Sequence, residues 1–271
     1  MGDTTVTTNP PSKSGSKTGA TAAYEATAKS VSTPANNPVE LRRTALHAEH
    51  LAAGARMVDF GGWDMPLSYR SQIEEHQSVR DHGGLFDVSH MTVLDLTSPE
   101  SDGAVAKFLR HLLANDIARI PGVGGALYTC MLNQQGGVID DLIAYRMAED
   151  HFRLVVNAST RDKDLAWIEQ HLPASVHLLV RDDLALMAIQ GPAAIATLSQ
   201  VLAASVEMAA SEALIGRLES LQRFNSFELD GCWIARTGYT GEDGVELSVD
   251  ASRAPRLWRC LLYTSPSPRD S

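Results

Sequence analysis

The chain has 271 residues, which is enough for one large domain or two modest ones with a substantial core. Its 44% hydrophobic and 21% charged residues are typical of a globular protein, and no apolar run approaches the roughly 20 residues of a membrane-spanning helix. The 23 Lys and Arg against 33 Asp and Glu give a formal charge of -10, which argues against nucleic acid or an anionic membrane as the main partner. Three dispersed cysteines without a CxxC pair (Cys130, Cys232 and Cys260) predict neither a disulfide framework nor a zinc or other metal site, and they favour a cytoplasmic location.

The composition of both ends differs from that of the middle. Residues 1–38 are rich in Thr, Ser, Ala, Gly and Pro and almost lack large apolar side chains, so we predict a disordered tail. A transit peptide is the alternative, but no Arg precedes Arg42 and two acidic residues are present. Residues 260–271 resemble a translated sequencing adapter rather than a genuine Ser/Pro-rich tail. We therefore expect a folded domain over residues 39–259, a non-native read-through tail over 260–271, and a fragment that ends before the natural protein does.

The middle of the chain mixes both kinds of secondary structure. An i, i+3, i+4, i+7 apolar pattern predicts helices over residues 102–115 and 159–172, and in the second of these Ser159 and Asp162 have the spacing of a capping box. Many of the predicted strands are joined by short turns, which indicates antiparallel neighbours. The predicted fold class is α+β, with largely antiparallel sheets and packed helices. The predicted strands cover residues 91–96, 127–132, 138–146, 152–157, 176–180, 184–189, 226–229, 233–236 and 245–249.

The segment over residues 136–145 places two carboxylates inside a predicted strand. Because side chains alternate between the faces of a strand, Asp140 shares a face with Leu142, whereas Asp141 shares the other with Ile143 and Tyr145. Either way, one carboxylate lies among apolar side chains, where an unpaired charge costs several kcal/mol. A functional site would explain this. That both Asp residues cap the turn or accept hydrogen bonds from backbone amides is at least as good an explanation from the pattern alone.

Two further segments contain polar residues that could form a site. Residues 237–246 combine three glycines with Thr, Tyr and Glu, which fits either a loop whose backbone approaches a ligand or a hairpin with a polar rim. Asp87, Ser89 and His90 lie close together in sequence, but no GxSxG motif is present, so a hydrolase triad is disfavoured and a hydrogen-bonded structural His90 is expected.

These segments, in this order, resemble the glycine cleavage T-protein family of aminomethyltransferases. Each motif alone is weak, whereas the ordered set is specific and extends over essentially all of residues 41–259. The matching stretches are LRRT (41–44), GARMVDFGGW (54–63), LFDVSHM (85–91), GGVIDDLI (136–143), LVVN (154–157) and RTGYTGEDGVE (236–246).

The resemblance implies a specific reaction. Such proteins take the aminomethyl group from the lipoyl arm of the H protein and transfer its carbon to tetrahydrofolate, forming 5,10-methylenetetrahydrofolate and ammonia. The family pattern assigns the critical acid to Asp141, which would hold the folate amine, accept its proton and stabilise developing positive charge. The positions that match the family pattern also imply folate contacts at Met91, Tyr128, Tyr145, Asn157, Tyr239 and Glu246.

The chain departs from the family pattern where it ends. Full-length members continue into a segment with a basic folate contact and then into a C-terminal β-barrel domain, so we expect the fragment to have little or no activity. Two other classes of relative are alternatives: a folate-binding module for iron–sulfur cluster assembly, and the folate domain of dimethylglycine or sarcosine oxidising enzymes. The second alternative lacks support because no flavin-sized segment or GxGxxG motif precedes residue 41.

Overall fold

The computed structural model describes residues 40–100, 102–204 and 208–264, with side chains described from residue 212 onward in the third range. The predicted tail over residues 1–38 lies outside these ranges. Within them, the strands form a two-stranded ribbon and two five-stranded sheets, and every pair of neighbouring strands is antiparallel. The predicted α+β class with antiparallel sheets and packed helices is therefore confirmed. No described helix is long and apolar enough to cross a membrane.

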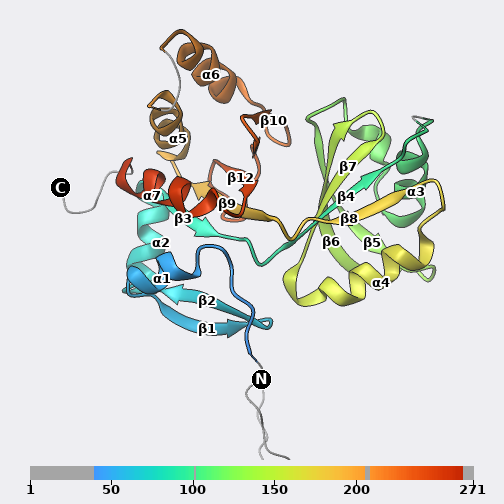
Figure 1. The fold of residues 1–271 in the computed structure, drawn as a ribbon, viewed down its shortest axis with the longest axis horizontal. Coiled ribbons are helices and arrows are strands. Elements are labelled where there is room, and N and C mark those ends of the chain that lie inside the picture. The colour runs from blue at the N-terminus through green and yellow to red at the C-terminus, as the bar shows by residue number, and fades with distance from the viewer. Residues whose placement is uncertain (1–39, 101, 205–207, 265–271) are drawn as a thin grey trace, which may run out of the picture. The chain divides into compact units, whose positions relative to one another are not determined.

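One sheet has the strand order β5-β6-β7-β4-β8. Helices α3 (Ala104–Leu112) and α4 (Arg161–His171) lie beside it in Figure 1, and their apolar residues share one core with the sheet. Both helices and all five strands overlap the elements predicted from sequence. The strands are β4 (Thr92–Thr97), β5 (Ala126–Leu132), β6 (Val138–Ala148), β7 (His151–Val156) and β8 (His177–Val180).

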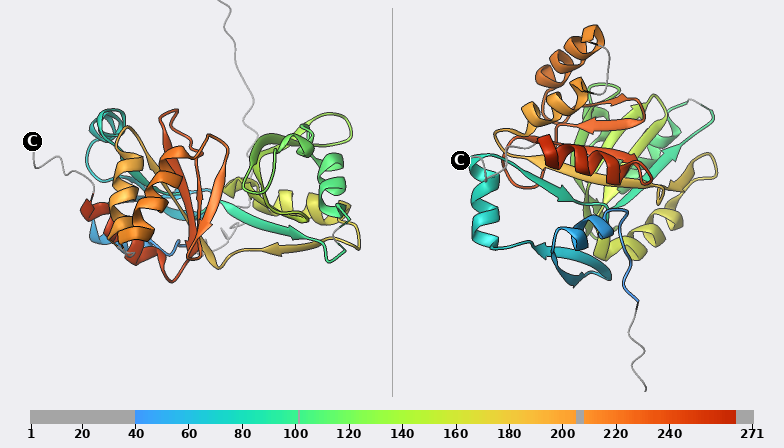
Figure 2. Two further views of the ribbon diagram at one scale, coloured as in Figure 1. Left: turned by 90° about the horizontal axis from the view of Figure 1, so that it is seen from above. Right: turned by 60° about the vertical axis from the view of Figure 1, so that its left-hand side comes forward.

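The other sheet has the order β10-β11-β12-β9-β3. Its core is completed by residues of α5 (Ala194–Ala203), α6 (Met208–Ser220) and α7 (Ala254–Thr264), and Figure 2 shows α5 and α7 beside these strands. The strands are β3 (Gly84–Asp87), β9 (Leu184–Gln190), β10 (Ser226–Leu229), β11 (Cys232–Ala235) and β12 (Gly244–Asp250).

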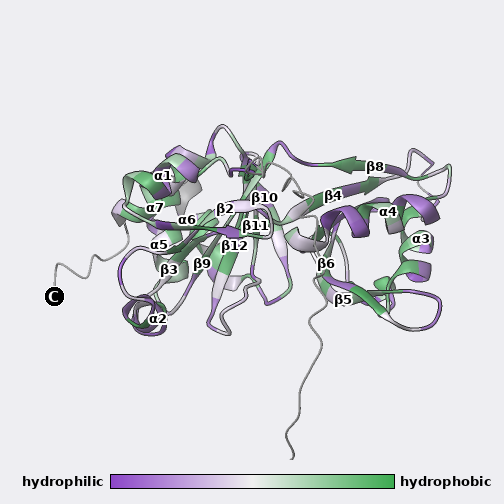
Figure 3. Cartoon of the chain, turned by 90° about the horizontal axis from the view of Figure 1, so that it is seen from below, coloured by the Kyte–Doolittle hydropathy of each residue, from purple (hydrophilic) through white to green (hydrophobic). Residues whose placement is uncertain are grey.

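The elements before residue 88 escaped prediction from sequence. They are α1 (His47–Ala52), the ribbon of β1 (Arg56–Phe60) and β2 (Trp63–Ser68), α2 (Gln72–Asp81) and β3. Helix α2 has no buried residue and is mostly hydrophilic in Figure 3. Without a buried apolar face, such a helix has no periodic hydrophobic signal in the sequence.

Strand β6 confirms the predicted alternation of side chains. Asp140 and Leu142 are buried on the face that carries the α3–α4 core, whereas Asp141 lies on the opposite face with Ile143 and Tyr145. The face of Tyr145 packs against residues of the other sheet in a third hydrophobic cluster, which includes Trp233. Strand β6 therefore presents Asp141 toward the side on which the two sheets meet.

The start of α4 differs from the predicted capping box. A short 3-10 turn, η2 (Ala158–Thr160), precedes the helix, and the N-cap residue Thr160 makes no side-chain cap hydrogen bond. Its hydroxyl instead donates to Oδ2 of Asp140 at 2.9 Å. The capping prediction was wrong because Ser159 lies inside η2, so the N-cap position falls on Thr160, whose hydroxyl makes this tertiary hydrogen bond instead.

The predicted domain end at residue 259 falls within α7. The helix runs on to Thr264, and Leu261 is 1% exposed in the core beside β9 and β12. Residues 260–264 therefore take part in the last described helix. The read-through prediction concerns the origin of residues 260–271, and it stays a prediction.

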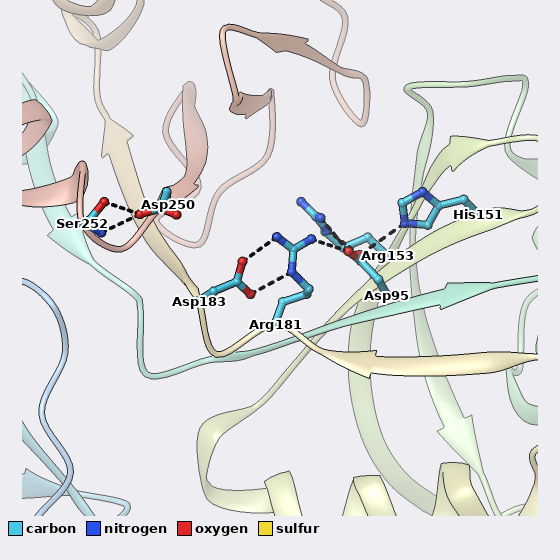
Figure 4. Close-up of polar contacts among 7 residues, drawn as sticks. All are labelled: Asp95, His151, Arg153, Arg181, Asp183, Asp250 and Ser252. Atoms are coloured by element: carbon cyan, nitrogen blue, oxygen red, sulfur yellow. Dashed lines mark hydrogen bonds and ion pairs between the residues drawn. The ribbon is translucent and has the colours of Figure 1, made fainter.

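A buried ion network lies where the chain passes from β8 to β9. Asp95 on β4 accepts two hydrogen bonds from Arg153, at 2.7 and 2.8 Å, and one from Arg181 at 2.6 Å (Figure 4). Arg181 also donates to both carboxylate oxygens of the exposed Asp183. Arg181 lies between β8 and β9, so this network fixes the connection between the two sheets.

Candidate functional site

The candidate site is built around the carboxylate of Asp141. The Tyr128 hydroxyl on β5 donates to Oδ2 of Asp141 at 2.6 Å, and the side-chain amide of Asn157 donates to Oδ1 at 3.2 Å. Asn157 directly follows β7, so three neighbouring strands of one sheet supply the three residues. Each oxygen of Asp141 thus has a neutral donor, an arrangement that holds an ionised carboxylate in place.

The two tyrosines nearest Asp141 respond to its charge. The hydrogen bond to Asp141 raises the pKa of Tyr128 to about 12. Partial burial of Tyr239, together with the charges of Glu246 and Asp141, raises its pKa well above the ordinary value. Both phenols therefore stay protonated at neutral pH and act as hydrogen-bond donors. About half of each side chain is exposed, 52% for Tyr128 and 51% for Tyr239, so both can reach a bound molecule.

A second group of residues surrounds the buried carboxylate of Glu246 on β12. The hydroxyls of Thr237 and Tyr145 donate to its Oε2, the latter at 3.5 Å, and the two hydroxyls lie 3.2 Å apart. Burial raises the pKa of Glu246, and hydrogen bonds from Thr237, Tyr239 and Tyr145 partly offset this. Tyr145 comes from β6 of one sheet and Glu246 from β12 of the other, so this contact joins the two sheets.

Tyr239 connects the two groups. Its hydroxyl also lies 3.4 Å from the sulfur of Met91, which stands just before β4. All seven residues predicted from the sequence, including Asp141, therefore form one set linked by hydrogen bonds or close charges. The loop over residues 236–243 adopts the irregular conformation expected of a glycine-rich segment, with Gly241 at φ +80°.

Several buried polar groups near Glu246 lack partners within the described residues. The indole N–H of Trp233 and the hydroxyl of Ser248 have none, and both residues line a small cavity together with Tyr145 and Glu246. The cavity has a volume of about 20 Å³, enough for a single water molecule.

The structure gives Asp140 a structural role and brings beside it Asp164, which the sequence did not single out. Asp140 accepts hydrogen bonds from the backbone N–H of Asn157 at 3.1 Å, from the Asn157 amide at 2.9 Å and from Thr160. Asp164 on α4 lies beside it and is fully buried. Helical spacing could have revealed Asp164 in the sequence. It precedes the core residue Ile168 by four positions and therefore belongs to the apolar face of the helix.

The Asp87 segment forms a structural network rather than a triad. The carboxylate of Asp87 accepts from the Thr44 hydroxyl at 2.6 Å and pairs with Nε2 of the buried His50 at 2.9 Å. The Ser89 hydroxyl instead exchanges hydrogen bonds with the backbone of Leu186 on β9. The Nδ1 atom of His90 has no partner in the described part of the chain, so the hydrogen bonding expected of His90 is not found at that nitrogen. The disfavoured hydrolase reading gains no geometric support.

Comparison with known proteins places this fold and sequence in a family. The model of the GCVT N-terminal domain family matches residues 46–267. The crystal structure of glycine cleavage system aminomethyltransferase T from Bartonella henselae is 33% identical, with a TM-score of 0.71 over 82% of this chain. This chain covers 57% of that protein's length.

A more distant likeness exists to the heterotetrameric sarcosine oxidase from Corynebacterium sp. U-96. It is 16% identical with a TM-score of 0.46, and the match covers 82% of this chain and 94% of that one. A likeness at this level carries no argument about function. The match to the family model and the 33% identity to the aminomethyltransferase do carry one: the chain belongs to the GCVT N-terminal domain family.

Proposed function

We propose that this chain is the folate-binding part of an aminomethyltransferase, which transfers the carbon of an aminomethyl group on lipoylated H protein to tetrahydrofolate and releases ammonia. The observation that carries the proposal is the position of Asp141. Its carboxylate is held by two neutral donors, is half-buried on the face of β6 opposite the α3–α4 core, and has the tyrosines Tyr128 and Tyr239 beside it. Membership of the GCVT family supports the same reaction class.

The residues present suit a reduced pterin. Tetrahydrofolate supplies the amine that takes up the one-carbon unit. Glu246 offers a buried carboxylate whose donors among the described residues are hydroxyl groups, and adjacent ring N–H groups are better partners for a carboxylate. Met91 and Tyr239 provide an apolar and aromatic surface for a flat ring.

Asp141 would act on protons at the reacting nitrogen. Its Oδ1 and Oδ2 atoms are already oriented by Asn157 and Tyr128, so little reorganisation is needed when positive charge develops nearby. The carboxylate can accept a proton from the amine of the folate and stabilise the cationic substrate carbon. The two donors keep this carboxylate in one orientation throughout.

The proposal is tested by binding and by transfer. Isothermal titration of the chain with tetrahydrofolate under anaerobic conditions should show one site, which Glu246→Gln weakens by about tenfold or more. Ammonia release should then be measured with aminomethyl-loaded H protein and tetrahydrofolate. We expect Asp141→Asn to lower the rate and Asp162→Asn, an exposed residue on α4, to leave it unchanged.

The two measurements separate binding from activity. No binding of tetrahydrofolate at high micromolar concentration would contradict the folate proposal. The chain can also be extended with the remaining part of the related aminomethyltransferase. If the extended protein binds tetrahydrofolate but releases no ammonia, the chain is a folate-binding module and aminomethyl transfer is contradicted.

A further inference from the structure

Asp164 is a buried carboxyl group without a donor. It is the fourth residue of α4, its exposed fraction is 0%, and neither of its side-chain oxygens accepts a hydrogen bond from an N–H or O–H group of the described residues. A carboxylate in such a position would carry an unpaired buried charge, which costs several kcal/mol in general. The residue therefore needs either a proton or a partner.

Only one carboxyl group faces it. The groups that act on Asp164 are Asp140 on β6, Thr160 at the start of α4 and Lys163 next to it in sequence. The ammonium group of Lys163 donates to the backbone carbonyl of Ile139 instead. Thr160 has a single hydroxyl proton, whose shortest contact is Oδ2 of Asp140 at 2.9 Å. Asp164 is thus left facing the carboxylate of Asp140.

The two carboxyl groups have opposite surroundings. Asp140 accepts three hydrogen bonds, from the backbone and side-chain N–H groups of Asn157 and from Thr160. Burial opposes the charge of Asp140, but the hydrogen bonds from Asn157, Asp164 and Thr160 outweigh it and hold the pKa of Asp140 below its usual range. Burial, reinforced by the adjacent Asp140, raises the pKa of Asp164 to about 7. Two buried carboxyls in contact do not both ionise, so they share one proton.

We propose that Asp164 is a positioning residue, which in its protonated form donates its carboxyl proton to Asp140, so that Asp140 can fix the Asn157 amide against the catalytic carboxylate of Asp141. The catalytic part of this inference rests on the proposed function, whereas the proton-sharing part does not. No bond to carbon is made or broken by Asp164, and its proton remains between the two carboxyl oxygens.

The coupling runs through one amide group. The side-chain nitrogen of Asn157 lies 2.9 Å from Oδ1 of Asp140, 3.1 Å from the backbone oxygen of Asp141 and 3.2 Å from its Oδ1. Loss of the Asp164 proton places a second negative charge beside Asp140. The three hydrogen bonds that Asp140 accepts must then readjust, and the Asn157 amide moves with them relative to Asp141.

The first test needs neither folate nor activity. The side-chain amide resonances of Asn157 are followed by NMR against pH in the ¹⁵N-labelled chain, beside the carboxyl carbons of Asp140 and Asp164. We expect the Asn157 signals to shift with a midpoint near pH 7 in the parent chain. In Asp164→Asn, whose amide N–H can donate to Asp140 at every pH, that transition should disappear.

The control and the contradicting outcome are equally direct. Asp162→Asn removes an exposed carboxylate two residues away and should leave the transition intact. A transition that persists in Asp164→Asn, or an Asp164 carboxyl that titrates near pH 4, would overturn the inference.

The second test concerns transfer itself. In the full-length context, Asp164→Asn should keep the rate within a few-fold and remove the part of its pH dependence centred near 7. Asp164→Leu, which cannot donate, should lower kcat by up to about a hundredfold while changing KM for tetrahydrofolate little. Equal kcat and pH profile in the parent and both variants would contradict the positioning role. If transfer fails in the parent protein, the NMR result still decides the proton-sharing part.

Discussion

The hydroxyl of Tyr128 donates to Oδ2 of Asp141 at 2.6 Å, diagonally across the antiparallel pair β5–β6. The two residues come from adjacent strands and project from the same face, where diagonal side chains are within reach of each other. This contact orients the proposed catalytic carboxylate without neutralising it. Both residues are accessible enough to meet a ligand.

The titration of Tyr128 reports this contact. Because the hydrogen bond to Asp141 raises the pKa of the phenol to about 12, we expect its ultraviolet difference absorbance to appear near pH 12 rather than near 10. In Asp141→Asn the midpoint should fall toward 10, since the charge is gone. A Tyr128→Phe variant identifies the signal. An unchanged midpoint in Asp141→Asn would show that the contact does not form in solution.

The two adjacent carboxylates should respond differently to substitution. We predict that Asp141→Asn lowers aminomethyl transfer by about a hundredfold or more, because the proton acceptor is lost, while leaving stability within about 1 kcal/mol. Asp140→Asn should have the milder effect on transfer. However, it should lower the free energy of unfolding by about 1.5–3 kcal/mol, because Asp140 is buried and accepts three hydrogen bonds. Urea unfolding and ammonia release measure the two effects. If the two variants were equally stable and lost transfer to a similar extent, the catalytic role would have been assigned to the wrong carboxylate.

The pH dependence of stability should reveal Asp164. Its folded pKa of about 7 lies above the ordinary Asp value near 4, so the folded protein binds the proton more tightly than the unfolded chain. The stabilisation is therefore complete below about pH 4 and is lost as pH rises through 7, at a slope of at most about 1.4 kcal/mol per pH unit. Urea unfolding of the parent relative to Asp164→Asn should show this decline. A difference that stays constant from pH 4 to 7 would contradict it.

The Asp95 network should be the strongest electrostatic contribution to the connection between the sheets. Asp95→Asn leaves the buried Arg153 without its anion, and removing one partner of a buried pair typically costs about 3–5 kcal/mol. The hydrogen bonds from Arg153, His151 and Arg181 outweigh burial and hold the pKa of Asp95 well below its usual range. The stabilisation is therefore present above about pH 4 and is lost as pH falls below it.

The matched control is Asp183, an exposed carboxylate that pairs with Arg181 of the same network (Figure 4). Asp183→Asn should cost less than about 1 kcal/mol, as is usual for exposed ion pairs. Thermal unfolding of the two variants at pH 7 compares them. Equal destabilisation would show that burial does not distinguish the two carboxylates.

Two glycines provide a contrast in backbone constraint. Gly191 has φ +121°, and a Cβ atom there would lie 2.5 Å from the carbonyl oxygen of Val79, so Gly191→Ala should destabilise by several kcal/mol. Gly216 lies in α6, and apart from its own chain neighbours and helix backbone no atom of the described residues lies within 4 Å of such a Cβ. Gly216→Ala should therefore stabilise by about 0.5–1 kcal/mol. A destabilised Gly216→Ala would indicate a contact on that face of α6.

The sequence by itself determined the strands from β4 onward and the division of faces along β6. Alternation of apolar and polar residues was enough to place Asp141 on the face of Tyr145 and to separate it from Asp140, because a strand has a fixed period of two. The family resemblance then selected Asp141, Asn157 and the residues around Glu246, and the structure brings these together.

Only the tertiary structure decided which of these residues act on one another. The hydrogen bond between Tyr145 and Glu246 joins side chains 101 residues apart on different sheets, and Asp164 meets Asp140 because α4 packs its apolar face on β6. The low-hydrophobicity helix α2 and the ribbon β1–β2 likewise carry no local pattern that reveals them. Local periodicity reports which way a side chain points along its own element. The packing of elements that are distant in the sequence decides which side chains then face one another. The burial that raises the pKa of Asp164 exists only once that packing has formed.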